Sequence, residues 1–288
     1  MIARILLLFF LSSGILFSQT YPDQFYNFEK DSLVKKITTM SGIQAGSDGK
    51  SIVLSDGALS GYAEFQPDSS AYPFNQGLPS WNGRVPNDNS SFRVLMRFYT
   101  NGWSPWLTAG YWKAQIWSSY GTTSYAGGRV NIDEIEMNSY CSKWQFRVEM
   151  MRTSASQPSP KVQKLSFFVS DTKTTTNYNL AAIVNDKPAS VFIPTQHFYQ
   201  YALDPEIGGS ICSPTSVSMV IRSYNIKVDP LQFARDNYDN YFGQFGLWPR
   251  VVQHAAEFGL KGAVTRYRTW SEARKVLAAG GRVVMSVG

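Results

Sequence analysis

The sequence predicts two domains, an all-β sandwich followed by a domain that mixes helices and strands. Its 288 residues leave room for both, because one domain typically takes about 100 to 200 residues. Residues 19–169 contain short apolar segments separated by turn-forming residues, which is typical of a sandwich. Residues 188–288 show helical spacing before a last apolar, strand-like segment. Between them, the polar residues 170–187 predict a linker.

The first 18 residues are expected to be a signal peptide. Arg4 provides the basic start, residues 5–17 are mostly apolar, and Ser18 is a small residue suited to cleavage. The polar interruption at residues 12–14 argues against a membrane span, which needs about 20 continuous apolar residues. No cysteine stands at the cleavage position for lipid attachment. We therefore expect an exported protein without a stable membrane anchor.

Four patterns carry the strand prediction for residues 19–169. The first ends at Glu64 and Phe65, and the others cover Phe92–Tyr99, Val130–Met137 and Val162–Val169. Each is rich in β-branched or aromatic residues, as strands generally are. Turns are expected at the following glycine-containing segments: Trp81-Asn82-Gly83, Asn101-Gly102 and Ala126-Gly127-Gly128.

Aromatic residues make up 15% of the chain, and six of the eight tryptophans lie in the predicted sandwich. They are Trp81, Trp103, Trp106, Trp112, Trp117 and Trp144. Filling the sandwich core is the commoner role for such rings. The alternative is a platform for a cell-surface polysaccharide, for which Gly102–Trp106 is the best candidate.

Charge and motifs exclude several classes of function. The formal net charge is +6, but lysines and arginines form no continuous run, so no nucleic-acid partner is expected. Asp133, Glu134 and Glu136 divide between the two faces of a strand, which favours a solvated surface over a carboxylate pair. Because HExxH, P-loop, GxGxxG and clustered Cys/His motifs are missing, we expect neither a metal nor a cofactor.

The chain has two cysteines, Cys141 and Cys212. An exported protein could bridge them in an oxidising compartment. They lie in different predicted domains, however, and we favour two unpaired thiols. The alternation of Trp144, Phe146 and Val148 places Cys141 on the solvent face of its strand.

Cys212 is expected at the start of a helix. Gly208 and Gly209 precede it, Pro214 suits a first helical turn, and the apolar residues that follow it recur at helical spacing. The free N–H groups at a helix start favour a thiolate over a thiol, as a cysteine nucleophile requires. A buried structural cysteine is the alternative. Further helices are expected from Val228 to Ala234, Pro249 to Phe258 and Thr269 to Gly280, followed by a strand at Arg282–Val287.

The segment Cys-Ser-Pro-Thr-Ser-Val-Ser-Met that begins at Cys212 resembles the nucleophile motif of a group of papain-like cysteine peptidases. The group is related to the double-glycine-leader peptidases of bacterial exporters, and the similarity is to its secreted, stand-alone branch. Val191–Pro194, Gly246–Pro249 and Arg282–Val287 also stand where that family has corresponding segments. Ser213 departs from the commoner glycine.

This resemblance implies a papain-like peptidase domain over residues 188–288 and an activity towards peptides or proteins through a thioester on Cys212. It implies two donors for the oxyanion, the Cys212 backbone N–H and a glutamine upstream. Gln200 is the first choice for that glutamine and Gln196 the reserve.

The catalytic base is the missing part of the predicted site. Only His197 and His254 are present, one in an expected loop and the other in an expected helix. The resembling family carries its histidine, and then an Asp or Asn, on strands that follow the counterpart of Arg282–Val287. We therefore expect a C-terminally truncated fragment of a secreted cysteine peptidase or amidase. The alternative is a non-catalytic exported binding protein, with an aromatic β-domain and a degenerate peptidase fold.

Overall fold

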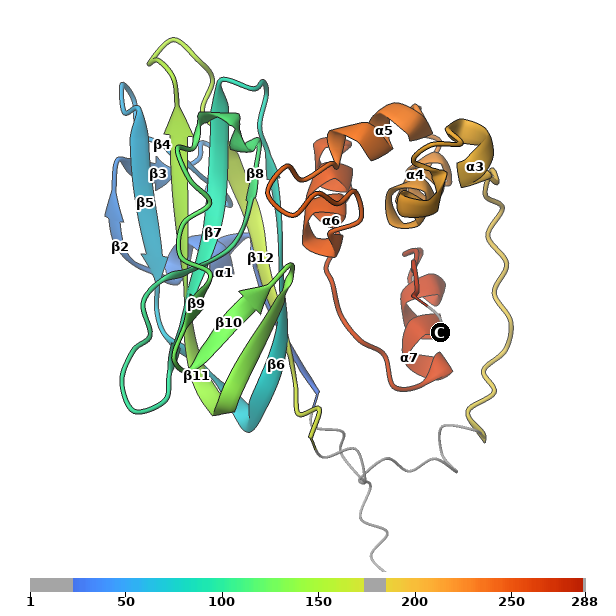
Figure 1. Cartoon of the computed structure of the whole chain (residues 1–288), viewed down its shortest axis with the longest axis horizontal. Coiled ribbons are helices and arrows are strands. Elements are labelled where there is room, and N and C mark those ends of the chain that lie inside the picture. The colour runs from blue at the N-terminus through green and yellow to red at the C-terminus, as the bar shows by residue number, and fades with distance from the viewer. Residues whose placement is uncertain (1–22, 174–184, 287–288) are drawn as a thin grey trace, which may run out of the picture.

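The computed structural model describes residues 23–173 and 185–286 (Figure 1). We call these two parts the β-domain and the helical domain. The predicted signal peptide, residues 1–18, and most of the predicted linker lie outside the described residues. Within the two described parts, no helix is both long and apolar enough to cross a membrane.

The β-domain consists of short and long antiparallel strands with one short helix, α1 (Asp31–Lys35). Its strands are β1 (Gln24–Glu29), β2 (Ile37–Ser41), β3 (Ile43–Ala45), β4 (Ile52–Leu54), β5 (Ser60–Phe65), β6 (Asp68–Arg84), β7 (Ser90–Tyr99), β8 (Leu107–Trp112), β9 (Ser124–Tyr125), β10 (Gly128–Asn131), β11 (Glu134–Arg152) and β12 (Lys161–Ser170). A 3-10 turn, η1 (Ala114–Ile116), follows β8.

The strands form two layers joined by the two longest strands, β6 and β11. One layer contains β8, β7, the second half of β11, β5 and β2, and the other contains β6, β12, β1, β4 and β3. Since β6 also pairs with the first half of β11, hydrogen bonding continues from one layer to the other. The result is the predicted sandwich, nearly closed into a barrel.

Aromatic side chains fill the space between the layers. Phe167 on β12 contacts Phe98, Trp144 and Phe146 of the facing layer, with ring centroids 5.0 to 6.3 Å apart. Trp81 and Trp112 are also buried. The prediction of a tryptophan-filled core is therefore correct for three of the six rings.

Two local predictions in the β-domain are wrong. Val130–Met137 is not one strand but a hairpin, because Ile132 adopts a positive φ of 64° and turns the chain between β10 and β11. Trp81-Asn82-Gly83 is not a turn but lies inside β6. A Cβ atom at Gly83 would stand 2.3 Å from the Lys161 carbonyl oxygen, so this glycine serves strand packing rather than a turn.

The prediction that Cys141 faces solvent is also wrong, since only 2% of this residue is exposed. The pairing of β11 with β6 shifts register on both sides of Cys141. A one-residue irregularity reverses which face of a strand a side chain occupies. The alternation read from Trp144 therefore does not extend back through the bulge to Cys141.

The helical domain contains α3 (Gln200–Leu203), a 3-10 turn η3 (Gly208–Ser210), α4 (Cys212–Arg222), α5 (Pro230–Asp236), α6 (Trp248–Glu257) and α7 (Trp270–Ala278). Asp229 caps α5, and Thr269 with Glu272 forms the predicted capping box of α7. The strand predicted at Arg282–Val287 is absent through Ser286. No neighbouring strand lies beside it among the described residues, and a strand needs such a ladder partner.

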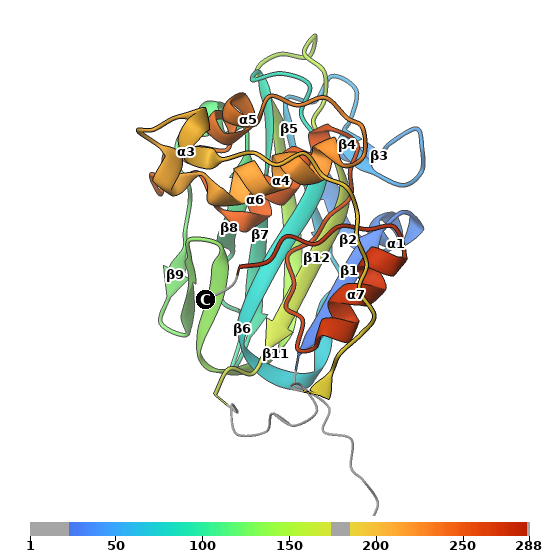
Figure 2. The same cartoon turned by 90° about the vertical axis from the view of Figure 1, so that its right-hand side faces the viewer.

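Helix α6 lies between α4 and the β-domain (Figure 1), and the helices together cover the face of the sandwich that contains β6 and β12 (Figure 2). It packs against β6 and β8 on one side and against α4 on the other. The apolar cluster of the helical domain joins Ile221 of α4, Phe233 of α5, and Val251 and Ala255 of α6. The position of the Cys212 helix therefore depends on a helix that itself lies against the sandwich.

Candidate active site

Cys212 is the first residue of α4, as predicted, and its side chain is exposed. The buried Ile211 precedes it and holds this end of the helix against the protein. Within the helix the first intrahelical bond runs from the Thr215 N–H to the Ile211 carbonyl at 3.0 Å. No side chain caps this end of α4, so the thiol lies beside N–H groups that can interact with a negative charge.

The chain leading into Cys212 is held by Gln200 and Tyr201. Gln200 Nε2 donates to the Gly208 carbonyl at 2.6 Å. A Cβ atom at Gly208 would lie 2.8 Å from the Tyr201 ring, so glycine is needed where this ring crosses the backbone. Gln200, the predicted oxyanion donor, thus has one amide hydrogen committed to positioning the turn before Cys212.

On its other side, the start of α4 meets the loop between α5 and α6. A Cβ atom at Gly246 would lie in ordinary contact with the Ser213 side chain, at 3.6 Å. Asp239 holds this loop because its carboxylate accepts hydrogen bonds from the Tyr241 and Phe242 N–H groups. The start of α4 is therefore flanked by two segments, η3 before it in the chain and this loop beside Ser213.

Gln196 and His197 lie in an exposed segment without helix or strand. In the described structure neither side chain makes a hydrogen bond, while the next residue, Phe198, contacts the Met219 sulfur of α4 through its N–H at 3.4 Å. This segment therefore lies beside α4, and no contact brings either side chain to Cys212.

His254 is buried at the junction of the two domains and is 7% exposed. Its ring stacks on Phe233, with centroids 4.1 Å apart, and lies 5.2 Å from Trp112 of the β-domain. Burial, reinforced by the nearby positive charges of Lys113 and Arg250, lowers its pKa to about 3.

The ring nitrogen Nδ1 of His254 faces the Asn237 side-chain amide at 2.8 Å. A neutral histidine that is enclosed by aromatic rings and an amide is a packing residue.

Two family models match the chain. Residues 192–288, which include Cys212 and its flanking segments, match the Peptidase_C39 like family, and residues 60–170 match the Peptidase C39 N-terminal domain. The chain thus carries a C39-like peptidase domain. From β5 onward, the β-domain matches the model of a C39 N-terminal domain, and the match at residues 192–288 agrees with the resemblance seen at Cys212.

Three solved structures each align with about half of this chain, at low identity and low TM-score. A chitosan-binding module of a chitosanase/glucanase from Paenibacillus sp. IK-5 is 13% identical, with 52% of this chain and 96% of the module aligned at a TM-score of 0.23. The xylan-binding module CBM15 is 9% identical, with coverages of 46% and 86% and a TM-score of 0.22. A glycosylation-associated protein complex from Streptococcus agalactiae is 14% identical, with coverages of 51% and 26% and a TM-score of 0.22. No curated protein matches the chain.

Both cysteines are free, which confirms the expectation of unpaired thiols. Burial raises the pKa of the Cys141 thiol, which contacts the Tyr99 and Lys143 carbonyl oxygens. Cys212 is therefore the accessible thiol of the C39-like domain, and Cys141 is part of the sandwich core.

Among residues 23–173 and 185–286, no group of three His, Cys, Asp or Glu side chains is placed to hold a metal ion.

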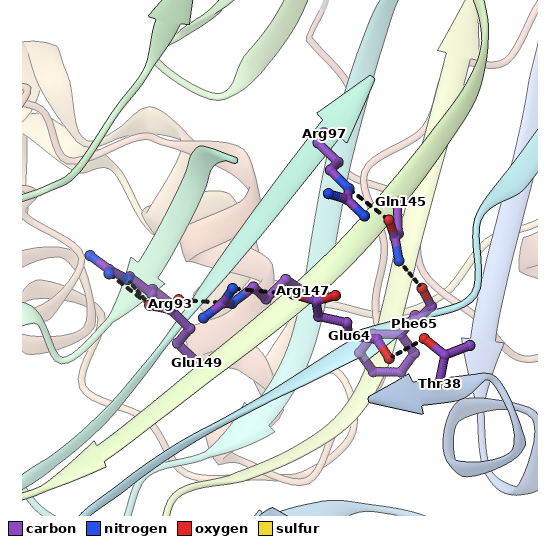
Figure 3. Close-up of polar contacts among 8 residues, drawn as sticks. All are labelled: Thr38, Glu64, Phe65, Arg93, Arg97, Gln145, Arg147 and Glu149. Atoms are coloured by element: carbon purple, nitrogen blue, oxygen red, sulfur yellow. Dashed lines mark hydrogen bonds and ion pairs between the residues drawn. The ribbon is translucent and has the colours of Figure 1, made fainter. Parts of the chain in front are cut away.

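The outer face of β5, β7 and β11, away from the C39-like domain, carries a polar network (Figure 3). Arg147 pairs with Glu64 at 3.2 Å and with Glu149 at 2.9 Å, and Glu149 also pairs with Arg93 at 2.6 Å. Beside them, Arg97 donates to the Gln145 side chain at 2.7 Å. These residues alternate with the core residues of the same strands.

The three tryptophans that do not fill the core lie over this network. Arg97 stands between Trp103 and Trp106, 4.7 and 4.5 Å from their ring centroids, and Arg93 is 4.4 Å from Trp117. All three rings are partly exposed. The alternation of strand residues predicts a polar outer face, but the loop conformations that lay tryptophans over arginines are not readable from the sequence.

Proposed function

We propose that this protein is an exported cysteine peptidase or amidase in which Cys212 is the nucleophile. The observation that carries the proposal is an exposed thiol on the first residue of α4, inside the C39-like domain. A cysteine at a helix start, outside the core, gains nothing for packing. Its position does suit the stabilisation of a thiolate.

In the proposed reaction the Cys212 thiolate attacks the carbonyl carbon of a peptide or other amide. The carbonyl oxygen becomes an oxyanion, to which the Cys212 backbone N–H donates a hydrogen bond. The amine then leaves with a proton and a thioester remains on Sγ. Water attacks this thioester, which releases the acid and restores the thiol.

The second oxyanion donor is proposed to be Gln200, with Gln196 as the alternative. Gln200 uses one amide hydrogen on the Gly208 carbonyl and keeps another. Gln196 is exposed, and its side-chain amide makes no hydrogen bond to the part of the chain that the structure describes. Replacing each by alanine separates a positioning role from an oxyanion donor: loss of a positioning contact should speed hydrogen–deuterium exchange in the turn before Cys212, whereas loss of an oxyanion donor should leave this turn unchanged.

A histidine must also reach the thiol. His254 is committed to the domain junction, so the proposal requires His197 or a residue outside this chain as the base. The reactivity of the Cys212 thiol can therefore be measured by alkylation, independently of whether the protein hydrolyses an amide.

Alkylation of the native protein with iodoacetamide near pH 6 tests whether Cys212 is activated. Peptide mass spectrometry should find Cys212 modified faster than the thiol of glutathione, because the thiolate is the reactive species. Cys141 is the internal control and should stay unmodified, since it is buried and its pKa is raised. Modification of Cys212 no faster than glutathione would remove the support for a nucleophile.

A second candidate function is binding of a polysaccharide by the outer face of the β-domain. The specific observation is the partly exposed pair Trp103 and Trp106 on either side of Arg97. Calorimetric titration with chitosan and xylan oligosaccharides tests it. Trp106→Ala should weaken any binding, whereas replacement of the exposed Trp248 on α6 should not.

A further inference from the structure

Helix α6 has two buried faces of different chemistry. Val251 and Ala255 belong to the apolar cluster shared with α4 and α5. Arg250, Gln253 and Glu257 follow one another at helical spacing on another face. A polar face on a helix normally meets water, but these three side chains meet the β-domain instead.

Glu257 makes the closest of these contacts. Its Oε1 atom accepts hydrogen bonds from the Val85 N–H and from Trp112 Nε1, both at 2.8 Å. Burial raises the pKa of the Glu257 carboxyl. One oxygen of the C39-like domain therefore satisfies two buried donors of the β-domain.

The other two residues bind backbone carbonyl groups of the sandwich. Gln253 Nε2 donates to the Gly83 carbonyl at 3.0 Å, and Arg250 Nη1 donates to the Tyr111 carbonyl at 3.4 Å. Gly83 is on β6 and Tyr111 on β8, so α6 binds two strands of the β-domain at once. Gln253 would lose its carbonyl partner if α6 left the β-domain, whereas Arg250 would keep the Asn237 carbonyl and the Asp239 carboxylate of its own domain.

The start of α6 is capped from the other domain. The residue at its N-cap position, Leu247, offers no side-chain acceptor. Instead, the Trp248 N–H donates to Asp133 Oδ2, at 3.0 Å, from the turn between β10 and β11. Asp133 therefore does for α6 what a serine or aspartate at the N-cap position does for most helices.

The chain after α6 continues along the outer face of β6. The Gly262 N–H donates to the Asn82 side chain at 3.1 Å and the Val264 N–H to Ser80 Oγ at 3.0 Å. Val264 also packs against Leu78 and Phe168. A strand face that water would otherwise cover thus supplies hydrogen bonds and apolar contacts to the helical domain.

The apolar core that the helices make for themselves is small by comparison. Its buried members are Ile221, Val228, Phe233, Val251 and Ala255. Small domains bury too little apolar surface to be stable alone without additional support. In this part of the chain, the additional support comes from the β-domain.

We propose that the β-domain is the folding scaffold of the helices that carry Cys212. It holds α6 at its N-terminus and along its polar face, and α6 holds α4 through the shared apolar cluster. This role is distinct from binding a substrate or a polysaccharide, and it does not depend on whether Cys212 is catalytic.

Hydrogen–deuterium exchange of the intact chain tests the scaffold. Glu257→Ala leaves two buried donors without an acceptor, so exchange in α4, α5 and α6 should become about 5- to 150-fold faster. Glu257→Gln keeps an acceptor and should restore most of the protection. Glu136→Ala is the matched control, because Glu136 is a β-domain carboxylate bound to Arg129 and Asn131 of its own domain.

If Glu257→Ala does not fold, Asp133→Ala applies the same test at the start of α6. Faster exchange in the helices, or throughout the chain, supports the scaffold. Exchange in α4 to α6 that matches the Glu136→Ala control in both variants overturns it.

Cutting the chain between the domains gives a second test. A specific protease site is placed between residues 173 and 185, and the cleaved protein is analysed by size-exclusion chromatography and circular dichroism. We expect the two pieces to elute together, or the helical piece to unfold once it separates. A separated helical piece that keeps its helical spectrum contradicts the proposal.

Discussion

His254 connects the stability of the protein to pH. Its pKa in the folded protein is about 3, below the ordinary value of 6.5, because its ring is buried. As pH falls below 6.5, the unfolded chain binds a proton that the folded chain does not. The free energy of unfolding is therefore expected to decrease from pH 6.5 towards pH 3, by up to about 1.4 kcal/mol for each pH unit.

Urea denaturation of the wild type and His254→Phe at several pH values measures this contribution. Phenylalanine keeps a ring against Phe233 but cannot bind a proton. The difference in unfolding free energy between the two proteins should shift in favour of the variant as pH falls from 6.5 to 4. Glu257, whose pKa is raised, changes in the opposite direction but is present in both proteins. Parallel pH profiles would show that His254 is not the responsible group.

Cys212 gives a prediction about the chain as it stands. We expect residues 1–288 to show no measurable hydrolysis of peptide substrates, because general base assistance typically contributes about 10² to 10⁴ in rate and no base contacts this thiol in the described residues. A fluorogenic peptide panel with Cys212→Ala as the blank measures it. Activity that Cys212→Ala abolishes would point to His197, and His197→Ala would then be decisive.

Individual residues differ in how well sequence alone predicts their positions. Cys212 could be placed because its neighbours, glycines before it and Pro214 after it, are local signals of a helix start. Cys141 could not, since a bulge in β11 is set by the pairing with β6 rather than by nearby residues. The sequence pattern places Asp133 on the strand face opposite Glu134 and Glu136, but it does not indicate the partner of Asp133, because Trp248 is 115 residues away in the chain.

At the scale of elements, the helices α4 to α7 were predictable from caps and periodicity. The β10–β11 hairpin was not, because Ile132 adopts a left-handed conformation that a β-branched residue seldom takes. Long strands such as β6 also escaped prediction, since their pairing with distant strands outweighs the turn signal of Gly83. The final strand predicted at Arg282–Val287 shows the converse, because this segment has a strand-like composition but no partner strand within residues 23–173 and 185–286.

The strained turn at Ile132 can be tested directly. Ile132→Asn should raise the free energy of unfolding by about 1 kcal/mol, because asparagine tolerates a positive φ far better than isoleucine. Gly49→Ala is the opposite control, since Gly49 has a φ of 63° and open space around its Cα. Chemical denaturation should show Ile132→Asn to be more stable than the wild type and Gly49→Ala to be less stable. Destabilisation by Ile132→Asn would mean that the isoleucine side chain contributes more than its backbone costs.

For the whole molecule, we expect an asymmetry between the two domains. The β-domain has its own large aromatic core, so residues 20–173 should fold when expressed alone. Circular dichroism should show a β-type spectrum with a cooperative thermal transition. The melting temperature should be below that of the full chain, because Trp112 Nε1 and the Val85 N–H lose their acceptor on Glu257. An unfolded spectrum would show that stabilisation is mutual rather than in one direction.

The contact between Asp133 and α6 restricts the length of the turn between β10 and β11. A two-residue turn at the protein surface ordinarily tolerates an inserted residue. At Ile132–Asp133, one extra residue would move the carboxylate off the first N–H of a helix in the other domain. The connection between β10 and β11 is therefore expected to keep its length among proteins that share this domain pair, while exposed turns without such a contact, such as the one at Gly49, are free to vary.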